Sequence, residues 1–371
     1  MALFASWPVP ETDTLQKERK PFMNYADVLP LDESAMTEAR QRIDSLSKPL
    51  GSLGQLEDYA VKLAGIRGFM GGTLAKRAVL VFAADNGIYE QGITPVPQDV
   101  TPMQTINIAN GIAGVNAFAA QAGADVFVYN VGIAKEVRQK NIIDAVVMRG
   151  TNDMTKGPAM TRGQCERAMK AGYEAAAAHA DYDVLGLGEM GICNTSTTAA
   201  VASVLLDKPV SAMTGKGAGI TEEQYQKKIA AISRAIEVNE PDANDPVDVI
   251  AKVGGLDIAA MTGAYLACAH YKVPVVIDGF ISACAALCAM RISPMSLGYM
   301  FASHKSYEQG YAAISKAHGL SPALMLDMRL GEGSGCPLMF YILEASLRML
   351  EDMGTFEEGC IDPTNYVDLR G

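Results

Sequence analysis

Short apolar runs and alanine-rich stretches alternate along most of the chain. Four runs rich in Val, Ile, Leu and Phe have the length of buried strands, at residues 77–87, 124–132, 183–191 and 273–280. Alanine-rich stretches of helical character follow three of these runs, at 101–123, 194–206 and 281–290. Repeated succession of a strand and a helix predicts an α/β fold, with a parallel sheet covered by helices on both faces.

The two ends of the chain show a different pattern. Prolines at positions 8, 10, 21 and 30 discourage helix and predict an extended arm over residues 1–30. A capped helix is expected from about Asp32, then a turn over 48–54 and a second helix from Gln55. Residues 337–358 have the spacing of an amphipathic helix. We therefore expect helices to flank the α/β part.

Glycines and polar residues end each strand-like run. They are Asp85-Asn86-Gly87, Gly188-Glu189-Met190-Gly191, Asp278-Gly279 and Gly331-Glu332-Gly333. Because the carboxyl ends of parallel strands meet at one edge of a sheet, we expect the ligand to bind there.

The last of these turns, RLGEGSG at 329–335, places a single carboxylate among three glycines after the apolar run 323–326. Gly331, Gly333 and Gly335 have no Cβ, so Glu332 can approach a bound ligand closely. This arrangement suits a general base. The alternative is a strand-to-helix turn with Glu332 solvated near a helix N-terminus.

The sequence GLGEMG at 186–191 matches G-x-G-x-x-G between a strand and a helix, which suggests a dinucleotide. The complete fingerprint needs an acid at the end of the next strand, whereas Asp207 follows a helix, and Glu189 would repel a pyrophosphate. We therefore predict no dinucleotide cofactor. The helix that begins in GICNTSTT can still offer backbone N–H groups and hydroxyls to one phosphate, with an ordinary N-cap by Asn194 or Thr195 as the alternative.

Composition narrows the class of partner. A net charge of −11 argues against nucleic acid or an anionic membrane, so a small molecule is expected. Seven scattered cysteines without a C-x-x-C pair predict reduced thiols in a cytoplasmic protein. The start of the chain lacks a secretory apolar block, and Asp278 and Gly279 interrupt the long apolar tract. The four histidines lack zinc-ligand spacing, so no metal ion is expected.

Two further residues are ambiguous from their patterns. His304, in FASHKSYEQG, follows an apolar stretch and either orients a neighbour or is solvated. Lys228, in QYQKKIAAISRAI, is most simply part of a solvated helix face. Neither pattern alone predicts chemistry.

Eight motifs, in order, make the chain resemble one enzyme family over nearly its whole length. They are SKPLGSLGQLE (47–57), ADNGIYEQGI (84–93), GPAM (157–160), LGLGEMGICNTS (185–196), KVGGLDIAAMTGAYL (252–266), VIDGF (276–280), SHKSYEQG (303–310) and MRLGEGSG (328–335). The family is the nicotinate mononucleotide:5,6-dimethylbenzimidazole phosphoribosyltransferases of cobalamin lower-ligand assembly. The resemblance implies a Rossmann-like α/β catalytic domain at 76–337 and a small helical domain at 31–75 and 338–371. It also implies a homodimer, with each active site near the partner's helices.

The resemblance assigns chemistry to two acids. Glu332 matches the family's catalytic base, which accepts the N–H proton of the acceptor as another ring nitrogen attacks C1′ of nicotinate mononucleotide. Nicotinate leaves, and the product is an α-ribosyl phosphate. Glu189 matches a second acid that stabilises the ribosyl centre or holds the acceptor. Because the leaving pyridinium is already cationic, no metal ion is needed, and no cofactor is implied.

The resemblance also assigns the binding residues. The residues implied for the donor and its phosphate are Gly191, Cys193, Asn194, Thr195, Lys228 and Ser306. The residues implied for the acceptor are Asp85, Val96, Gln104, Met190 and Leu330. Asn86, Val96, Met190 and Cys193 depart from the common pattern, so the acceptor stays open: dimethylbenzimidazole first, then benzimidazole, adenine, phenol or p-cresol. A phenol-activating member would act as one subunit of a heterodimer, and an inactive partner subunit is a further alternative.

Overall fold

One six-stranded parallel sheet organises the molecule. The computed structural model describes residues 28–216 and 219–370, so residues 1–27 of the predicted arm lie outside the described part. The strands are β1(Arg77–Ala84), β2(Ala124–Gly132), β3(Ile142–Asp144), β4(Val184–Met190), β5(Val275–Ile277) and β6(Met300–Ala302). Their order is β3-β2-β1-β4-β5-β6, and each neighbouring pair is parallel. This is the Rossmann-like order, which reverses between β1 and β4, and the predicted parallel sheet is confirmed.

The apolar runs predict β1, β2, β4 and β5 but not the two edge strands. β3 and β6 have three residues each, too few for a periodic pattern. The run 323–326 is not a strand, contrary to expectation. It makes one parallel bridge, between Leu324 and His304, and Met325 beside it is 77% exposed. Three backbone hydrogen bonds join this run to residues 302–305, where β6 ends, and so short a pairing does not make a strand.

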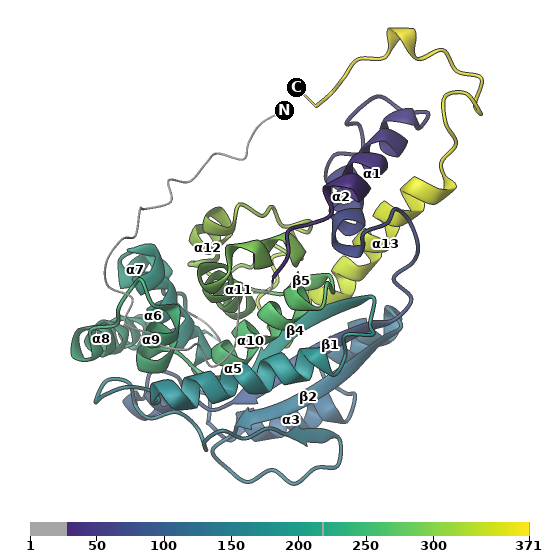
Figure 1. Ribbon diagram of the computed structural model, residues 1–371. Helices are drawn as coiled ribbons and strands as arrows, with labels where there is room; N and C mark the ends of the chain where they lie inside the picture. Colours follow the sequence, from purple (N-terminus) through teal and green to yellow (C-terminus); the bar gives the residue numbers. More distant parts are fainter. Residues whose placement is uncertain (1–27, 217–218, 371) are drawn as a thin grey trace.

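Helices cover both faces of the sheet (Figure 1). They are α1(Glu33–Ser45), α2(Gln55–Arg67), α3(Val100–Ala109), α4(Gly114–Gln121), α5(Arg162–Ala177), α6(Asn194–Leu206), α7(Val210–Met213), α8(Glu222–Asn239), α9(Pro246–Val253), α10(Leu256–His270), α11(Phe280–Ile292), α12(Tyr311–His318) and α13(Cys336–Asp352). Short 3₁₀ segments are η2(Gly87–Gln91), η3(Pro294–Tyr299) and η4(Pro363–Asn365). Among the described residues, no helix combines the length and apolar character needed to cross a membrane.

Alternate residues of β1 point to opposite faces of the sheet. Leu80 and Phe82 join the core that includes α5 and α10, whereas Val79 and Val81 join the core that includes α13. All four side chains are fully buried. A strand buried on both faces has no polar alternate positions, which is why this part of the sequence is a continuous apolar run.

The single helical stretch expected at 101–123 is two helices. α3 ends at Ala109 and α4 begins at Gly114. Between them, Gly111 has a φ of +81°, which glycine adopts without the strain that a Cβ would cause. The break leaves the first N–H groups of α4 without intrahelical partners, and one of them, that of Val115, enters the site described below.

Helices from the two chain ends pack together beside the sheet (Figure 1). α1 follows an N-cap by Asp32, whose side chain accepts from the Ala35 N–H at 2.9 Å, and α2 begins at Gln55, both as predicted. The expected amphipathic helix is α13, which ends at Asp352 rather than at 358.

α13 links two cores. Phe340, in its first half, packs against the sheet, while Leu350, near its end, packs with Ile43 of α1 and Val61 of α2. The predicted domain boundary at 338 therefore lies inside one continuous helix. The division of the chain into a helical and an α/β domain stays a prediction.

Candidate active site

A cavity of about 330 Å³ lies at the carboxyl ends of β4 and β5. Its walls come from residues 93–104, from the turn between β4 and α6, from the start of α11, from the loop after β6 and from residues 329–332. This is the edge of the sheet where the sequence predicts ligand binding, beside the reversal of strand order.

Glu332 lines this cavity and is held by two donors. Gln104 Nε2 donates to its Oε1 at 2.6 Å, and the Val115 N–H donates to its Oε2 at 3.2 Å. Glu332 is only 4% exposed, so the interpretation as a solvated turn residue is wrong. The two hydrogen bonds fix the orientation of the carboxylate, as a general base requires.

The backbone around Glu332 explains the three glycines. Glu332 has a φ of +64°, and Gly331 and Gly333 have φ values of +87° and +85°. A Cβ on Gly331 would lie 2.5 Å from Glu189 Oε1, and one on Gly333 would lie 2.7 Å from Val79 Cγ1. Positive φ at a non-glycine residue is uncommon and is found at sites that the surrounding structure holds in place. The turn thus brings Glu332 between β1, β4 and the cavity.

Gly186 and Gly188 of GLGEMG belong to strand β4, and only the third glycine, Gly191, lies in the turn before α6. A Cβ on Gly188 would lie 2.4 Å from the carbonyl oxygen of Glu332, and one on Gly186 would lie 2.4 Å from Cys336 Cβ. These glycines let the Glu332 turn and the start of α13 pack directly on the strand. Packing therefore accounts for the motif without a dinucleotide.

Asp278, at the end of β5, supports the same turn. Its Oδ2 accepts from the Gly333 N–H at 3.1 Å and its Oδ1 from the Gly335 N–H at 2.7 Å. His304 Nδ1 lies 3.9 Å from Asp278 Oδ1 and 3.0 Å from Ser303 Oγ. His304 is buried, so of its two interpretations the solvated one is wrong.

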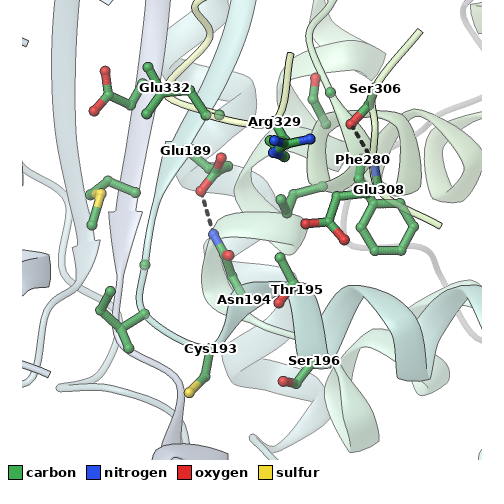
Figure 2. A pocket seen from close by; sticks show the side chains of 18 of the residues that line it. Glu189, Cys193, Asn194, Thr195, Ser196, Phe280, Ser306, Glu308, Arg329 and Glu332 are labelled. Carbon is green, nitrogen blue, oxygen red and sulfur yellow. Dashed lines mark hydrogen bonds between the residues drawn. The ribbon is translucent and has the colours of Figure 1, made fainter. Parts of the chain in front are cut away.

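Glu189 lies between Glu332 and Asn194 in the view of Figure 2. The Asn194 side-chain amide donates a hydrogen bond to its carboxyl group. Burial raises the pKa of Glu189 to about 8, and the negative charges of Asp257 and Asp278 add to the rise. Glu189 therefore carries a proton near neutral pH.

The start of α6 forms the other end of the cavity (Figure 2). Lys228 also lines the cavity there. Cys193 has a φ of 71°, which turns the chain from β4 into α6. Cys193 is the N-cap and no side chain caps the helix, so the alternative of an N-cap by Asn194 or Thr195 is wrong. A helix N-terminus without a side-chain cap favours an anion.

Lys228 points at this helix start. Its Nζ lies 2.9 Å from Thr195 Oγ1 and 3.2 Å from the Gly215 carbonyl oxygen. The residue is 4% exposed, so the interpretation as a solvated helix face is wrong. Burial lowers the pKa of Lys228, and the charge of Glu308 opposes this. Gly191 and Ser306 line the same cavity, so all six residues expected to bind the donor lie together.

Four of the five residues expected to bind the acceptor line the cavity: Val96, Gln104, Met190 and Leu330. The fifth, Asp85, does not. It is buried below the cavity lining, where its Oδ2 accepts from the Ala134 N–H at 2.9 Å, and burial raises its pKa. Asp85 therefore ties β1 to the loop after β2 instead of facing an acceptor.

A phosphoribosyltransferase family model matches residues 28–361, nearly all of the described chain. This chain belongs to that family. The nicotinate-nucleotide–dimethylbenzimidazole phosphoribosyltransferase of Clostridium perfringens is 44% identical over 342 residues, covering 92% of this chain and 95% of the relative. The enzyme of the same name from Acetivibrio thermocellus is 43% identical, covering 92% and 98%. The crystal structure of the Thermus thermophilus enzyme of that name superposes with a TM-score of 0.84 at 38% identity, covering 90% and 99%.

The cavity of this phosphoribosyltransferase also contains residues that the sequence did not single out. Arg329 and Glu308 line it, as do Thr94, Lys216 and Phe280. Arg329 and Glu308 fall inside the motifs MRLGEGSG and SHKSYEQG, and this membership is the only feature of the sequence that could have marked them as site residues. No spacing rule distinguishes a cavity-facing charge in a loop from a solvated one, so residue patterns alone could not select them.

Proposed function

We propose that this phosphoribosyltransferase transfers ribose 5-phosphate from nicotinate mononucleotide to a ring nitrogen of 5,6-dimethylbenzimidazole and releases nicotinate. The observation that carries the proposal is the buried, doubly hydrogen-bonded carboxylate of Glu332 in a cavity that also contains Lys228. The relatives from Clostridium perfringens and Acetivibrio thermocellus are named for the same pair of substrates.

The donor phosphate binds at the start of α6 in this proposal. Lys228 supplies a positive charge, and Ser306 and Thr195 supply hydroxyl groups. The backbone around Gly191 and Cys193 supplies N–H groups at a helix N-terminus. Charge and dipoles already in place bind a phosphate with little rearrangement, which leaves the ribose C1′ held toward Glu189 and Glu332.

The transfer itself is a displacement at C1′. A ring nitrogen of the acceptor forms a bond to C1′ as the bond from C1′ to the pyridinium nitrogen breaks, and the released electron pair neutralises the pyridinium. Attack opposite the leaving group inverts C1′ and gives an α-ribosyl phosphate. The other ring nitrogen of the acceptor loses its proton to Glu332. General bases of this kind typically contribute 10²–10⁴-fold in rate.

Glu189 supports the reacting centre beside Glu332. Its pKa of about 8 means that it carries a proton near neutral pH. We therefore assign it a hydrogen-bond donor role toward the ribose or the acceptor, in place of a full negative charge. The side-chain amide of Asn194 holds it in position.

The acceptor slot is apolar on the side of Val96, Met190 and Leu330. A flat bicyclic base buries more area there than a single ring, at ~25 cal/mol per Å² of apolar surface. Differences in apolar shape give only ~1–3 kcal/mol of discrimination, so the preference for dimethylbenzimidazole should be modest.

We infer a homodimer that works in the cytoplasm. Large apolar side chains are exposed on the elements around the cavity, namely Met103, Ile112, Met325, Leu326 and Leu330. Exposed apolar side chains on elements near one cavity favour a protein contact there. The seven cysteines are free thiols, which suits a reducing compartment. Light scattering of the purified protein tests the dimer.

The proposed reaction is tested by a competition experiment. Purified protein receives nicotinate mononucleotide with dimethylbenzimidazole, adenine, phenol and p-cresol together, without added metal, and the products are resolved by mass. We expect the α-ribosyl phosphate of dimethylbenzimidazole to be the most abundant product. Dominant phenolic products would contradict the acceptor, and absence of any ribosyl product would contradict the reaction.

A further inference from the structure

Arg329 lines the cavity, and the reaction described above gives it no role. Its guanidinium carbon lies 4.4 Å from the centre of the Tyr307 ring. A cation stacked on an aromatic face keeps its N–H groups at the edge of the guanidinium plane available to an anion. Within the described part of the chain, Arg329 forms no salt bridge with a carboxylate.

Backbone hydrogen bonds hold Arg329 beside the loop after β6. The Lys305 N–H donates to the Leu324 carbonyl at 2.8 Å, and the Tyr307 N–H donates to the Met328 carbonyl at 3.0 Å. The segment before Arg329 therefore runs alongside the loop that carries Ser306 and Glu308. These contacts place the guanidinium at the wall of the donor half of the cavity (Figure 2).

Glu308 lies within electrostatic reach of two cations. A Cβ on Gly215 would lie 2.3 Å from Glu308 Oε2, and the Gly215 carbonyl accepts from Lys228 at 3.2 Å. Burial raises the pKa of the Glu308 carboxyl, while the positive charges of Lys228 and Arg329 oppose the rise. The cavity wall thus presents a cation, a carboxylate and a second cation.

The donor carries a complementary series of groups. Nicotinate mononucleotide has an anionic phosphate at one end, a ribose diol and a cationic pyridinium in the middle, and an anionic carboxylate on the ring. Lys228 matches the phosphate, and Glu308 suits the hydroxyls or the ring cation but would repel either anion. The remaining lining cations are Arg329 and Lys216, and Lys216 is paired with Glu222 at 3.2 Å.

We propose that Arg329 binds the carboxylate of the nicotinate ring and thereby selects nicotinate mononucleotide over nicotinamide mononucleotide, an inference that rests on the proposed function. The two donors have the same ribose, phosphate and pyridinium leaving group. They differ only in a carboxylate against a neutral amide, so the discrimination has to come from a protein group that distinguishes charge. A guanidinium can bind a carboxylate through two parallel N–H···O bonds.

The test compares the two donors in one assay. Initial rates with dimethylbenzimidazole are measured for nicotinate mononucleotide and nicotinamide mononucleotide, using the wild-type protein, Arg329→Gln, Arg329→Lys and the control Lys305→Gln. Lys305 is an exposed lysine in the same loop, between the cavity-lining residues His304 and Ser306, and it does not itself line the cavity. Inhibition by free nicotinate and by free nicotinamide is measured in parallel.

We expect the wild-type protein to favour the nicotinate donor. Arg329→Gln should lower kcat/KM for that donor roughly ten- to a hundredfold, the usual range for a hydrogen-bonded charge pair, and change the nicotinamide donor by less than about threefold. Arg329→Lys should keep part of the preference, since it retains the charge but not the paired N–H groups. Lys305→Gln should resemble the wild type, and inhibition by nicotinate should weaken only in the Arg329 variants.

Equal loss with both donors in Arg329→Gln would overturn the inference, because it would indicate damage to the adjacent Glu332 turn. An unchanged donor preference, or a wild-type preference for the nicotinamide donor, would also overturn it. Failure of the wild-type protein to use either donor would instead overturn the proposed function, so the two failures are distinguishable.

Discussion

The two ends of the cavity differ in how deeply their lining side chains are buried. At the end proposed for the donor, Lys228, Ser306 and Asn194 are all at least nine-tenths buried, and α6 begins at the backbone turn at Cys193. At the end proposed for the acceptor, Leu330 is 60% exposed, and Val96 and Met190 are half-buried. A phosphate requires charges and dipoles held in place, whereas a flat base requires mainly apolar area. Changes at the donor end should therefore cost much, and changes at the acceptor end should be graded.

Glu332 is relevant to both ends, because we propose that it takes the proton of the acceptor, while a Cβ on Gly331 in the same turn would lie 2.5 Å from Glu189 Oε1. Glu332→Gln should keep the fold and lose turnover on the order of a hundredfold or more. Single-turnover rates and the melting temperature would be measured together. Near-normal turnover in a folded variant would remove Glu332 from its role as the base.

The next largest expected effect is that of Glu189→Gln on the free energy of unfolding, because Glu189 is buried with its proton. Its pKa in the folded protein, about 8, lies above the ordinary value of 4.5, so the folded state holds a proton that the unfolded state releases. The free energy of unfolding therefore falls as pH rises from about 4.5 to about 8. Glu189→Gln should lack this fall, so between pH 5 and pH 8 the variant gains on the order of 3 kcal/mol relative to wild type.

Urea unfolding at a series of pH values measures this difference. Glu223→Gln, an exposed carboxylate on α8, is the matched control and should follow the wild-type curve. If Glu189→Gln and the wild type lose stability in parallel over this range, Glu189 is ionised in the folded protein, and its hydrogen-bond donor role is lost with it.

Lys228→Ala should weaken binding of nicotinate mononucleotide more than binding of the acceptor. We expect KM for nicotinate mononucleotide to rise roughly tenfold, with a smaller change in KM for the acceptor, because a phosphate contact acts on ground and transition states alike. Lys227→Ala, the exposed neighbour on α8, serves as the control. A raised acceptor KM with an unchanged donor KM would contradict the placement of the phosphate.

Leu330→Ala should have the smallest effect. Removing part of an exposed apolar wall should raise KM for dimethylbenzimidazole by only about three- to tenfold, and it should reduce the margin over single-ring acceptors. Steady-state rates with dimethylbenzimidazole and phenol measure both quantities. A loss as large as that of Lys228→Ala would show that the acceptor end is as firmly built as the donor end.

Several features followed from local sequence. The apolar runs predict the four longer or more central strands because burial on both faces leaves no polar positions in them. Glycines around one acid predict a close-packed turn at Glu332, and its motif points to a catalytic base. Asp32 marks a helix start because side-chain capping depends on neighbouring residues only.

Other features depended on segments far apart in the chain. The hydrogen bond from Gln104 to Glu332 joins residues 228 positions apart. The Val115 N–H can donate to Glu332 only because α3 and α4 separate at Gly111. Burial of Lys228 depends on how α8 packs beside α6, which helical spacing alone did not show.

The sequence by itself determined the fold class and the family, because runs, turns and motifs are local properties of the chain. It also singled out candidate site residues, most of which line the cavity. Only the tertiary structure decided that Asp85 supports a loop behind the cavity and that Arg329 and Glu308 face into it. It also decided that Glu189 keeps its proton, since the pKa of a carboxyl depends on burial and on charges brought near it by folding.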